Sequence, residues 1–339
     1  MTTYTIHSND AAGWTGDGAH IDPLGPFVPL DVRSRIEDKG QRAIPGIAKD
    51  PHLTQKIEAQ ARALPTEHRL LLGDARGPLP VPDESVHLVV TSPPYWTLKE
   101  YAPNDRQLGE VEEYDTFLDE LDRVWQEAYR VLAPGGRLVV VVGDVCLSRR
   151  RYGRHVVFPL HASIQERCRF IGFDNLAPII WHKIANASLE AAGNGSSFLG
   201  KPYEPNAVVK NDIEYILFQR KPGGYRSPTE SMRALSVIPE AEHREWFRQI
   251  WTINGASTRE HPAPYPLSLA ERLVRMFSFV GDTVLDPFSG TATTSLAAGL
   301  WGRHSIGVEV EPSYMKLALT RLARELPDPL PLFAEVAGP

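Results

Sequence analysis

The 339-residue chain lacks most of the features that mark membrane, secreted or zinc-binding proteins. No apolar run approaches the roughly 20 residues needed to span a bilayer. The first twenty residues lack the basic start and apolar stretch of a secretory signal, so we expect a cytoplasmic protein. There are only two cysteines, Cys146 and Cys168, and no CxxC pair. We therefore predict no metal site and two reduced thiols.

An overall basic charge is also lacking, because the net charge is −6. The charge is unevenly distributed, however. Residues 146–226 contain twelve Lys and Arg against six Asp and Glu, a local charge of +6 that leaves −12 for the rest of the chain. This asymmetry suggests a middle segment that faces an anion such as a phosphate backbone. Charge alone leaves open the alternative that these are solvated surface residues.

Apolar segments of strand type and helix type alternate along most of the chain. Near-continuous apolar runs at 69–72, 86–91 and 137–144 are typical of strands buried on both faces of a parallel sheet. Apolar residues at helical spacing over 114–132 predict an amphipathic helix, which Pro134-Gly135-Gly136 ends. Further helices are predicted at about 159–171, 267–279 and 293–300, and strands at 177–181, 214–218, 283–285 and 305–308. These units predict an α/β fold with a doubly wound, mostly parallel sheet.

The string Thr91-Ser92-Pro93-Pro94-Tyr95-Trp96 comes directly after a predicted buried strand, where open α/β sheets bind ligands. Two successive prolines lack N–H groups and leave their carbonyls as acceptors. We expect Ser92 Oγ and the Pro93 carbonyl to accept the hydrogens of an exocyclic amine, while Tyr95 or Trp96 stacks on the ring. A base reaches such a site by flipping out of the duplex. A rigid Pro93-Pro94 turn with an aromatic plug is the purely structural alternative.

A second motif, at 284–294, has the pattern of a strand, a turn of small residues and a helix start. Gly290 can adopt backbone angles closed to other residues, which lets a ligand approach the main chain. The string contains neither a P-loop lysine nor a GxGxxG fingerprint. Glu309 ends the next predicted strand, where an acid usually binds the ribose of a nucleoside cofactor. Glu311 is a competing candidate, and a capping or surface role is the alternative for either residue.

Together these motifs resemble the DNA amino-methyltransferases of the β arrangement, in which the catalytic motif precedes the recognition region and the cofactor motif comes last. The resemblance covers about 69–322. It implies a Rossmann-like fold, S-adenosylmethionine as cofactor and double-stranded DNA as substrate. Ser92, Pro93, Pro94 and Tyr95 match its catalytic motif. The cofactor-binding residues that it implies are Asp74, Asp286, Phe288, Ser289, Gly290, Thr291, Glu309, His261 and Pro262.

Residue 292 departs from the family pattern, which commonly has Phe-x-Gly-x-Gly-Thr-Thr, whereas this chain has Ala292 at the second Gly. A methyl group fits there if the backbone angles are ordinary. A positive φ would strain the site and weaken cofactor binding. In view of the other matches we expect the chain to be active.

The resemblance favours N4 of cytosine as the methylated atom, because the Ser-Pro-Pro-Tyr form belongs mostly to N4-cytosine enzymes. Adenine enzymes usually carry Asp or Asn first, and N6-adenine methylation is the alternative. C5-cytosine methylation needs a Cys nucleophile after a Pro, and neither cysteine has that context. RNA or protein-glutamine methylation usually has the opposite motif order. A DNA-binding protein without catalysis is a last alternative, against which the intact Ser92, Tyr95, Asp286 and Glu309 argue.

Recognition of DNA is expected to involve the middle of the chain. Residues 143–226 look like restriction-modification enzymes of the N4-cytosine type, which implies a cognate restriction endonuclease that acts separately. Four arginines are candidates to hold phosphates or read guanine edges, with a solvated basic loop as the alternative. They are Arg149, Arg150, Arg151 and Arg154.

These assignments divide the chain into five parts. We expect an irregular N-terminal extension rich in Pro, Gly and Asp, with one helix at 52–64. A catalytic half and a cofactor-binding half of one methyltransferase domain flank a target-recognition region, from which a strand near 214–218 returns to the core. The predicted boundaries are 1–65 for the extension, 66–183 for the catalytic half, 184–258 for the recognition region, 259–326 for the cofactor half and 327–339 for a tail.

Overall fold

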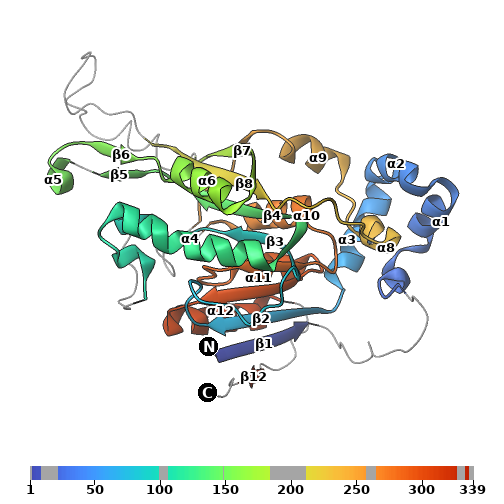
Figure 1. The fold of residues 1–339 in the computed structure, drawn as a ribbon. Helices are drawn as coiled ribbons and strands as arrows, with labels where there is room; N and C mark the ends of the chain where they lie inside the picture. Colours follow the sequence, from blue (N-terminus) through green and yellow to red (C-terminus); the bar gives the residue numbers. More distant parts are fainter. Residues whose placement is uncertain are drawn as a thin grey trace, which may run out of the picture.

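The computed structural model describes residues 2–8, 22–98, 106–147, 149–183, 211–256, 265–326 and 333–335. Ten strands form one sheet in the order β12-β1-β2-β11-β10-β3-β4-β8-β7-β9 (Figure 1). In chain order these strands are β1 (Thr2–Ser8), β2 (Thr66–Leu72), β3 (Val86–Thr91), β4 (Leu132–Val142), β7 (Asp174–His182), β8 (Ile213–Arg220), β9 (Ile250–Thr252), β10 (Thr283–Asp286), β11 (His304–Glu309) and β12 (Phe333–Glu335).

The centre of the sheet is parallel, as predicted. Strands β2, β11, β10, β3 and β4 all run in one direction. Both sides of this centre are antiparallel: β1 pairs with β2 and β12, and β8 pairs with β4 and β7. The sheet is therefore mixed, with a parallel core that brings the carboxyl ends of five strands to one edge.

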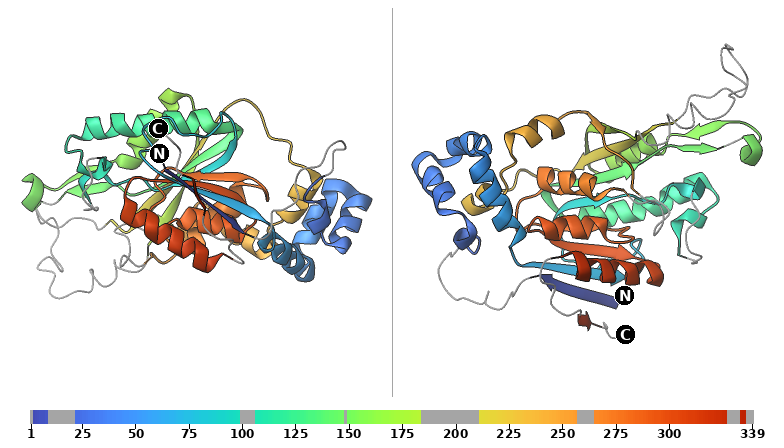
Figure 2. Two further views of the ribbon diagram at one scale, coloured as in Figure 1. Left: turned by 90° about the horizontal axis from the view of Figure 1, so that it is seen from below. Right: turned by 180° about the vertical axis from the view of Figure 1, so that it is seen from behind.

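Helices cover both faces of the sheet, which confirms the doubly wound arrangement (Figure 2). Alternate residues of the central strands point to opposite faces, so Val89 and Val140 join one apolar cluster and Val90 and Val139 join another. This two-sided burial explains why these strands are apolar throughout. The first cluster packs against α4 (Tyr114–Val131) and α6 (Leu160–Ile171). The opposite face carries α10 (Leu267–Phe277), α11 (Thr293–Leu300) and α12 (Pro312–Glu325).

The expectation of an irregular N-terminal extension is wrong for the described part. Strand β1 pairs with β2 over seven residue pairs. Three helices, α1 (Leu30–Lys39), α2 (Ile44–Ala48) and α3 (Pro51–Arg62), share an apolar cluster with α8 (Glu230–Leu235). Only α3 has the clear apolar spacing that the sequence analysis detected. The burial of Val32 and Ile36 in α1 depends on residues about two hundred positions away, so local patterning could not indicate it.

The segment Pro134-Gly135-Gly136 lies inside strand β4 and does not terminate the preceding helix. Helix α4 ends at Val131, and Leu132 already pairs with Val86 of β3. The next pair joins Leu88 to Arg137, so the intervening residues form an irregularity in the ladder. Gly135 has φ +77°, and a Cβ there would lie 2.5 Å from the Gly224 carbonyl oxygen, which excludes larger residues.

The described part of the predicted recognition region, 211–256, is largely scaffold. It supplies strands β8 and β9 to the sheet, helix α8 to the N-terminal cluster, and α9 (Glu240–Trp246). A separate hairpin of β5 (Val145–Leu147) and β6 (Val156–Phe158) projects beyond the main sheet and carries α5 (Arg149–Tyr152) at its tip (Figure 1). No helix in the described ranges is long and apolar enough to cross a bilayer.

Candidate active site

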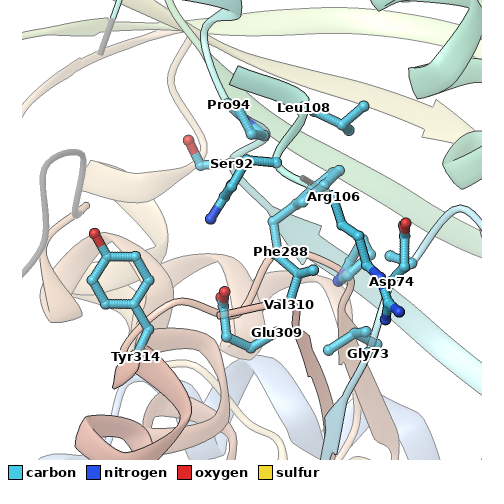
Figure 3. A pocket seen from close by; sticks show the side chains of 14 residues that line it. Gly73, Asp74, Ser92, Pro94, Arg106, Leu108, Phe288, Glu309, Val310 and Tyr314 are labelled. Atoms are coloured by element: carbon cyan, nitrogen blue, oxygen red, sulfur yellow. The ribbon is translucent and has the colours of Figure 1, made fainter. Parts of the chain in front are cut away.

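A cavity of about 590 Å³, a volume that includes solvent space at its opening, lies at the carboxyl ends of the central strands (Figure 3). Its wall includes Asp74 after β2, Ser92 after β3, Phe288 after β10 and Glu309 at the end of β11. Parallel strands bring these residues together, although up to 235 positions separate them in the sequence (309 − 74 = 235). Both predicted motifs therefore line one cavity.

Glu309 is held in place by the backbone of two neighbouring loops. Its carboxylate accepts hydrogen bonds from the amides of Gly290, at 2.8 Å, and Glu311, at 2.9 Å. Burial raises the pKa of Glu309 to about 7, although these hydrogen bonds oppose the change. The competing candidate Glu311 accepts from the Ser313 amide at 3.0 Å and caps helix α12. Of the two acids, Glu309 is the one that lines the cavity.

Asp74 lies on the neighbouring wall of the cavity and is oriented by an arginine. Arg76 contacts its carboxylate at 2.6 Å and also pairs with Glu120 of α4 at 2.7 Å. Burial acts to raise the pKa of Asp74, but hydrogen bonds from the Arg76 side chain and backbone outweigh it and place the pKa below its ordinary value. Asp74 is thus an ionised acceptor with a fixed direction at neutral pH.

The loop between β10 and α11 has the close packing that its small residues suggested. The Ser289 amide donates to the Val308 carbonyl at 2.9 Å, and Gly290 has φ +49°. A Cβ at Gly307 would lie 3.0 Å from Ser289 Cβ, so glycine at 307 allows this loop to approach β11. Thr291 is nearly buried, and its carbonyl accepts from Arg321 of α12 at 3.2 Å.

Ala292 has φ +61° and ψ +38°, in the left-handed region. The sequence allows either ordinary or left-handed backbone angles at this position, and the structure has the strained, left-handed conformation. An L-residue in this region costs about 1 to 2 kcal/mol relative to ordinary helical angles. The Ala292 side chain is fully buried among Leu70, Leu296 and Met315. Packing of the methyl group offsets part of the backbone cost.

Asp286 joins the two motifs from beneath the cavity. It is almost fully buried, and one of its carboxylate oxygens accepts from Thr91 Oγ1, at 2.7 Å, and from the Phe288 amide, at 3.0 Å. The other oxygen accepts from Thr294 Oγ1 at 2.7 Å and from Tyr265 at 3.2 Å. Burial raises the pKa of Asp286, and these donors oppose the rise. Asp286 thus acts through the position of the loop and of strand β3, since it does not line the cavity.

The side chains around the cavity fit a nucleoside cofactor. Carboxylate oxygens at Glu309 and Asp74 are acceptors for hydroxyl and amino hydrogens, while Phe288 and Val310 offer apolar surface to a flat ring. Among the described residues, no group of three or more His, Cys, Asp or Glu side chains could hold a metal ion. The residues present therefore match the chemistry of S-adenosylmethionine, with its ribose hydroxyls and adenine ring.

Of the four predicted catalytic residues, two line this cavity and two do not. Ser92 and Pro94 line it, and Pro93 is buried between them. The Tyr95 hydroxyl lies 3.5 Å from Ser92 Oγ and donates to Glu214 at 3.0 Å. Ser92 therefore faces the same cavity as Asp74, Phe288 and Glu309, whereas Asp286, Ser289, Gly290 and Thr291 do not line it.

Trp96 is placed differently from the expectation that it stacks on a base. Its ring is 6% exposed and lies edge-on to Tyr114 and Phe158, with centroids 5.1 and 4.9 Å away. Its indole N–H donates to the Val111 carbonyl at 2.8 Å. Because core residues enclose the ring, Trp96 anchors the loop after the motif. The sequence could not show whether Trp96 stacks on a base or packs in the core, because an aromatic residue after two prolines can do either.

The remaining predicted residues divide into two groups. His261 and Pro262 lie outside the described residues. Arg149, Arg150 and Arg151 form the helix at the hairpin tip, and Arg154 follows it, with its guanidinium 5.7 Å from the centre of the Tyr152 ring. Arg149, Arg150 and Arg154 do not line the cavity.

Several residues of the site were missed by the sequence analysis. Arg106, Leu108 and Tyr314 line the cavity from loops and from α12. Glu214 contacts Tyr95, and Arg76 orients Asp74. Only Arg76 could have been inferred from the sequence, because a basic residue two positions after Asp74 is close enough to pair with it. The others enter the site through tertiary contacts.

Comparison with known proteins agrees with this geometry. A family model described as DNA methylase, of the N6/N4 type, matches residues 86–320. The Type II methyltransferase M.MjaI of Methanocaldococcus jannaschii is 38% identical over 279 residues, which cover 73% of this chain and 88% of that protein. The DNA adenine methyltransferase YhdJ of Escherichia coli strain K12 is 28% identical over 265 residues, which cover 75% of this chain and 82% of that protein.

A solved structure is similar over most of the chain. TTHA0409 of Thermus thermophilus, complexed with S-adenosyl-L-methionine, is 56% identical with a TM-score of 0.64, and the match covers 78% of this chain and 95% of that one. The cavity and its acids match that cofactor. The chain belongs to the N6/N4 family of DNA methylases, and it uses S-adenosylmethionine to methylate an exocyclic amino group of a DNA base.

Proposed function

We propose that this enzyme methylates N4 of cytosine in double-stranded DNA. The observation that carries the proposal is that Ser92, a hydroxyl in place of an acid, lines the same cavity as Glu309. Within this family the Ser-Pro-Pro-Tyr form is typical of N4-cytosine enzymes. The cavity is reached only by a base that has left the duplex, so base flipping is part of the proposal.

The chain positions and polarises the amino group. When bound, S-adenosylmethionine supplies an electrophilic methyl group on a sulfonium centre. Ser92 Oγ and the Pro93 carbonyl accept the two amino hydrogens, which favours a more pyramidal and more nucleophilic nitrogen. Tyr95 provides the ring on which the base stacks. Ser92 is too weak a base to deprotonate the amine beforehand, so the proton leaves after methyl transfer, to solvent or to a neighbouring group.

The cofactor set in this proposal follows the cavity. Glu309 accepts the ribose hydroxyls and Asp74 contacts the adenine, while Phe288, Ser289, Gly290 and Thr291 shape the loop beside them. Asp286 holds that loop, and His261 and Pro262 stay assigned to the segment that leads into it. Trp96 is omitted from the base-stacking set because its indole N–H bonds to the Val111 carbonyl and its ring packs edge-on against two aromatic rings. Tyr95 is itself only 7% exposed, and it is kept because its hydroxyl lies beside Ser92.

The hairpin arginines Arg149, Arg150, Arg151 and Arg154 complete the proposal as phosphate contacts. The hairpin segment 145–158 contains these four arginines and no Asp or Glu. A two-stranded ribbon is also a shape that the major groove admits. We further propose a cognate restriction endonuclease that acts separately, because the curated relative M.MjaI is a Type II methyltransferase.

The deciding experiment is nucleoside mass spectrometry on amplified, unmethylated DNA of high sequence complexity, incubated with S-adenosylmethionine. We expect N4-methyldeoxycytidine. N6-methyldeoxyadenosine would overturn the base assignment, in favour of the activity named for the Escherichia coli relative. No methylated nucleoside would contradict the proposal as a whole, because such DNA contains every short target site.

The matched variant in this experiment is Ser92→Ala. Loss of one preorganised hydrogen-bond partner should lower kcat by about 100-fold. Cofactor binding, measured by calorimetry, should be nearly unchanged because Glu309 and Asp74 are intact. Equal turnover of the variant and the wild type would remove Ser92 from the mechanism.

A further inference from the structure

A chain of four polar side chains leads from the catalytic motif across the sheet. Lys183, directly after β7, forms an ion pair with Oε1 of Glu214 on β8. The other oxygen of Glu214, Oε2, accepts from the Tyr95 hydroxyl at 3.0 Å. Ser92 Oγ lies 3.5 Å from the same hydroxyl, with the Ser92 O–H as donor. Residues that are 119 positions apart in the sequence, Tyr95 and Glu214, are thus in direct contact.

A glycine in the intervening strand makes this contact possible. Strand β4 lies between β3 and β8, and Gly143 follows its last residue. A Cβ at Gly143 would lie 3.2 Å from Glu214 Cγ and 3.4 Å from Tyr95 Cε2. The two side chains therefore meet over a position at which a larger residue would press on both of them.

The environment fixes the direction of each hydrogen bond in the chain. The Glu214 side chain is 13% exposed, so an isolated carboxylate there would be costly, and Lys183 supplies its counter-charge. An ionised carboxylate only accepts hydrogen bonds. The Tyr95 O–H must therefore point to Glu214, which leaves the lone pairs of the phenol oxygen to accept the Ser92 hydrogen. Ser92 has a single hydrogen, and with that hydrogen directed at Tyr95 it presents only lone pairs to the cavity.

We propose that Lys183 and Glu214, acting through Tyr95, make Ser92 an obligate hydrogen-bond acceptor and so select bases with an exocyclic amino group. A base with a carbonyl at the same position, such as uracil in place of cytosine, would set its oxygen against the lone pairs of Ser92. Glu214 is in these terms a positioning residue. The inference deepens the proposed function, because it requires that the base meets Ser92.

The test variant is Glu214→Gln, with Asp212→Asn as its control. A glutamine amide can donate to the phenol oxygen, so that the Tyr95 hydrogen can turn to Ser92 Oγ and the Ser92 hydrogen can turn toward the cavity. Asp212 is a partly exposed carboxylate two residues away that pairs with His182 at 3.3 Å, so its variant removes one charge from the same region. We expect Glu214→Gln to lower kcat by about 10- to 100-fold with an unchanged KM for S-adenosylmethionine. The control should stay within about twofold of the wild type.

Two readouts separate this role from a structural one. In a Tyr95→Phe background, Glu214→Gln should lower kcat by less than about twofold, because the hydrogen bond between Glu214 and the Tyr95 hydroxyl is already absent. The wild type should also bind a duplex with cytosine at the mapped target position more tightly than one with uracil, and Glu214→Gln should narrow that preference. The proposal would be overturned if Glu214→Gln lowered kcat just as much in the Tyr95→Phe background. It would also be overturned if Glu214→Gln left the preference for cytosine over uracil unchanged.

The same experiment distinguishes failure of this inference from failure of the base assignment. If the wild type forms N6-methyladenine, N4-cytosine specificity fails, and the preference is measured with adenine against hypoxanthine. Hypoxanthine carries a carbonyl where adenine carries the amino group. For either base, Glu214→Gln should reduce the preference for the amino-bearing base over the carbonyl-bearing base. For either base, it should also lower kcat less in the Tyr95→Phe background than in the wild type.

Discussion

We expect Glu309, the proposed ribose acceptor, to make cofactor binding sensitive to pH within the physiological range. Its pKa of about 7 means that a substantial fraction of the carboxyl is protonated at neutral pH in the free enzyme. The protonated group has one acceptor oxygen fewer for the ribose hydroxyls. Cofactor binding therefore favours the ionised form and should release a proton.

We expect S-adenosylmethionine to bind about tenfold more weakly at pH 6 than at pH 8, because the ionised fraction of Glu309 falls from about nine-tenths to about one-tenth. Calorimetry in two buffers of different ionisation enthalpy measures both the Kd and the released proton. The Glu309→Gln variant should bind weakly, with only the pH dependence of the ligand itself. A wild-type Kd that is equal at both pH values would show that Glu309 does not titrate on binding.

At Ala292, the strain of a left-handed backbone opposes the stabilisation that the buried methyl group provides. Its left-handed backbone favours glycine by about 1 kcal/mol, whereas its buried methyl group contributes about 0.8 kcal/mol. We expect Ala292→Gly to change the free energy of unfolding by less than about 1 kcal/mol. Ala292→Val adds a β-branched side chain at positive φ and should cost more than about 2 kcal/mol. Chemical denaturation measures both. If Ala292→Gly lowered the free energy of unfolding by much more than about 1 kcal/mol, packing of the methyl group would outweigh the backbone strain.

At the scale of elements, the contact between β3 and β10 sets the distance between the catalytic motif and the cofactor loop. The two strands are adjacent and parallel, and Thr91 at the end of β3 donates to Asp286 at the end of β10. The same carboxylate accepts from Thr294 in the first turn of α11. One buried group therefore positions two loops and a helix.

We expect Thr91→Val, which is close in shape but lacks the donor, to lower the free energy of unfolding by about 1 kcal/mol. It should also lower kcat by about 10-fold, because Ser92 is the next residue and shifts relative to the cavity. Thr320→Val is the matched control, since the Thr320 hydroxyl bonds within its own exposed helix turn, to the Lys316 carbonyl at 2.9 Å. An unaltered kcat in Thr91→Val would show that the hydrogen bond between Thr91 and Asp286 is not needed to position Ser92 for catalysis.

At the scale of the whole molecule, the basic hairpin stands apart from the acidic remainder. Strands β5 and β6 carry exposed Arg150 and Arg154 away from the main sheet (Figure 1). The base of the hairpin packs on the catalytic loop, where Phe158 meets Trp96 at 4.9 Å. The proposed phosphate-binding surface is thereby attached to the loop that is proposed to receive the base.

We expect Arg150→Gln with Arg154→Gln to reduce the slope of log affinity for DNA against log salt by about 1.8, or 0.9 for each phosphate contact. Cofactor affinity should not change. The control replaces two exposed arginines elsewhere, Arg244→Gln on α9 and Arg324→Gln on α12, and should leave the slope at its wild-type value. Identical slopes for wild type and hairpin variant would place the DNA on another surface.

Much of the fold and of the site followed from short-range patterns. The central strands were predicted closely because two-sided burial makes each strand apolar throughout. Helix α4 was predicted closely because its buried residues repeat every three to four positions. The positions of Ser92, Asp286 and Glu309 followed because each lies at the end of a strand or directly after it, and parallel strands end at one edge. These are properties of neighbouring residues, so the sequence by itself determined them.

Other features depended on contacts between distant parts of the chain, and only the tertiary structure decided them. Strand β1 and helices α1 and α2 have weak local patterns and are stabilised by β2 and α8. Trp96 is enclosed by Phe158, Ala292 is held at φ +61°, and Glu214 reaches Tyr95 across β4. Packing and backbone angle arise from the whole set of neighbours, which no short stretch of sequence contains.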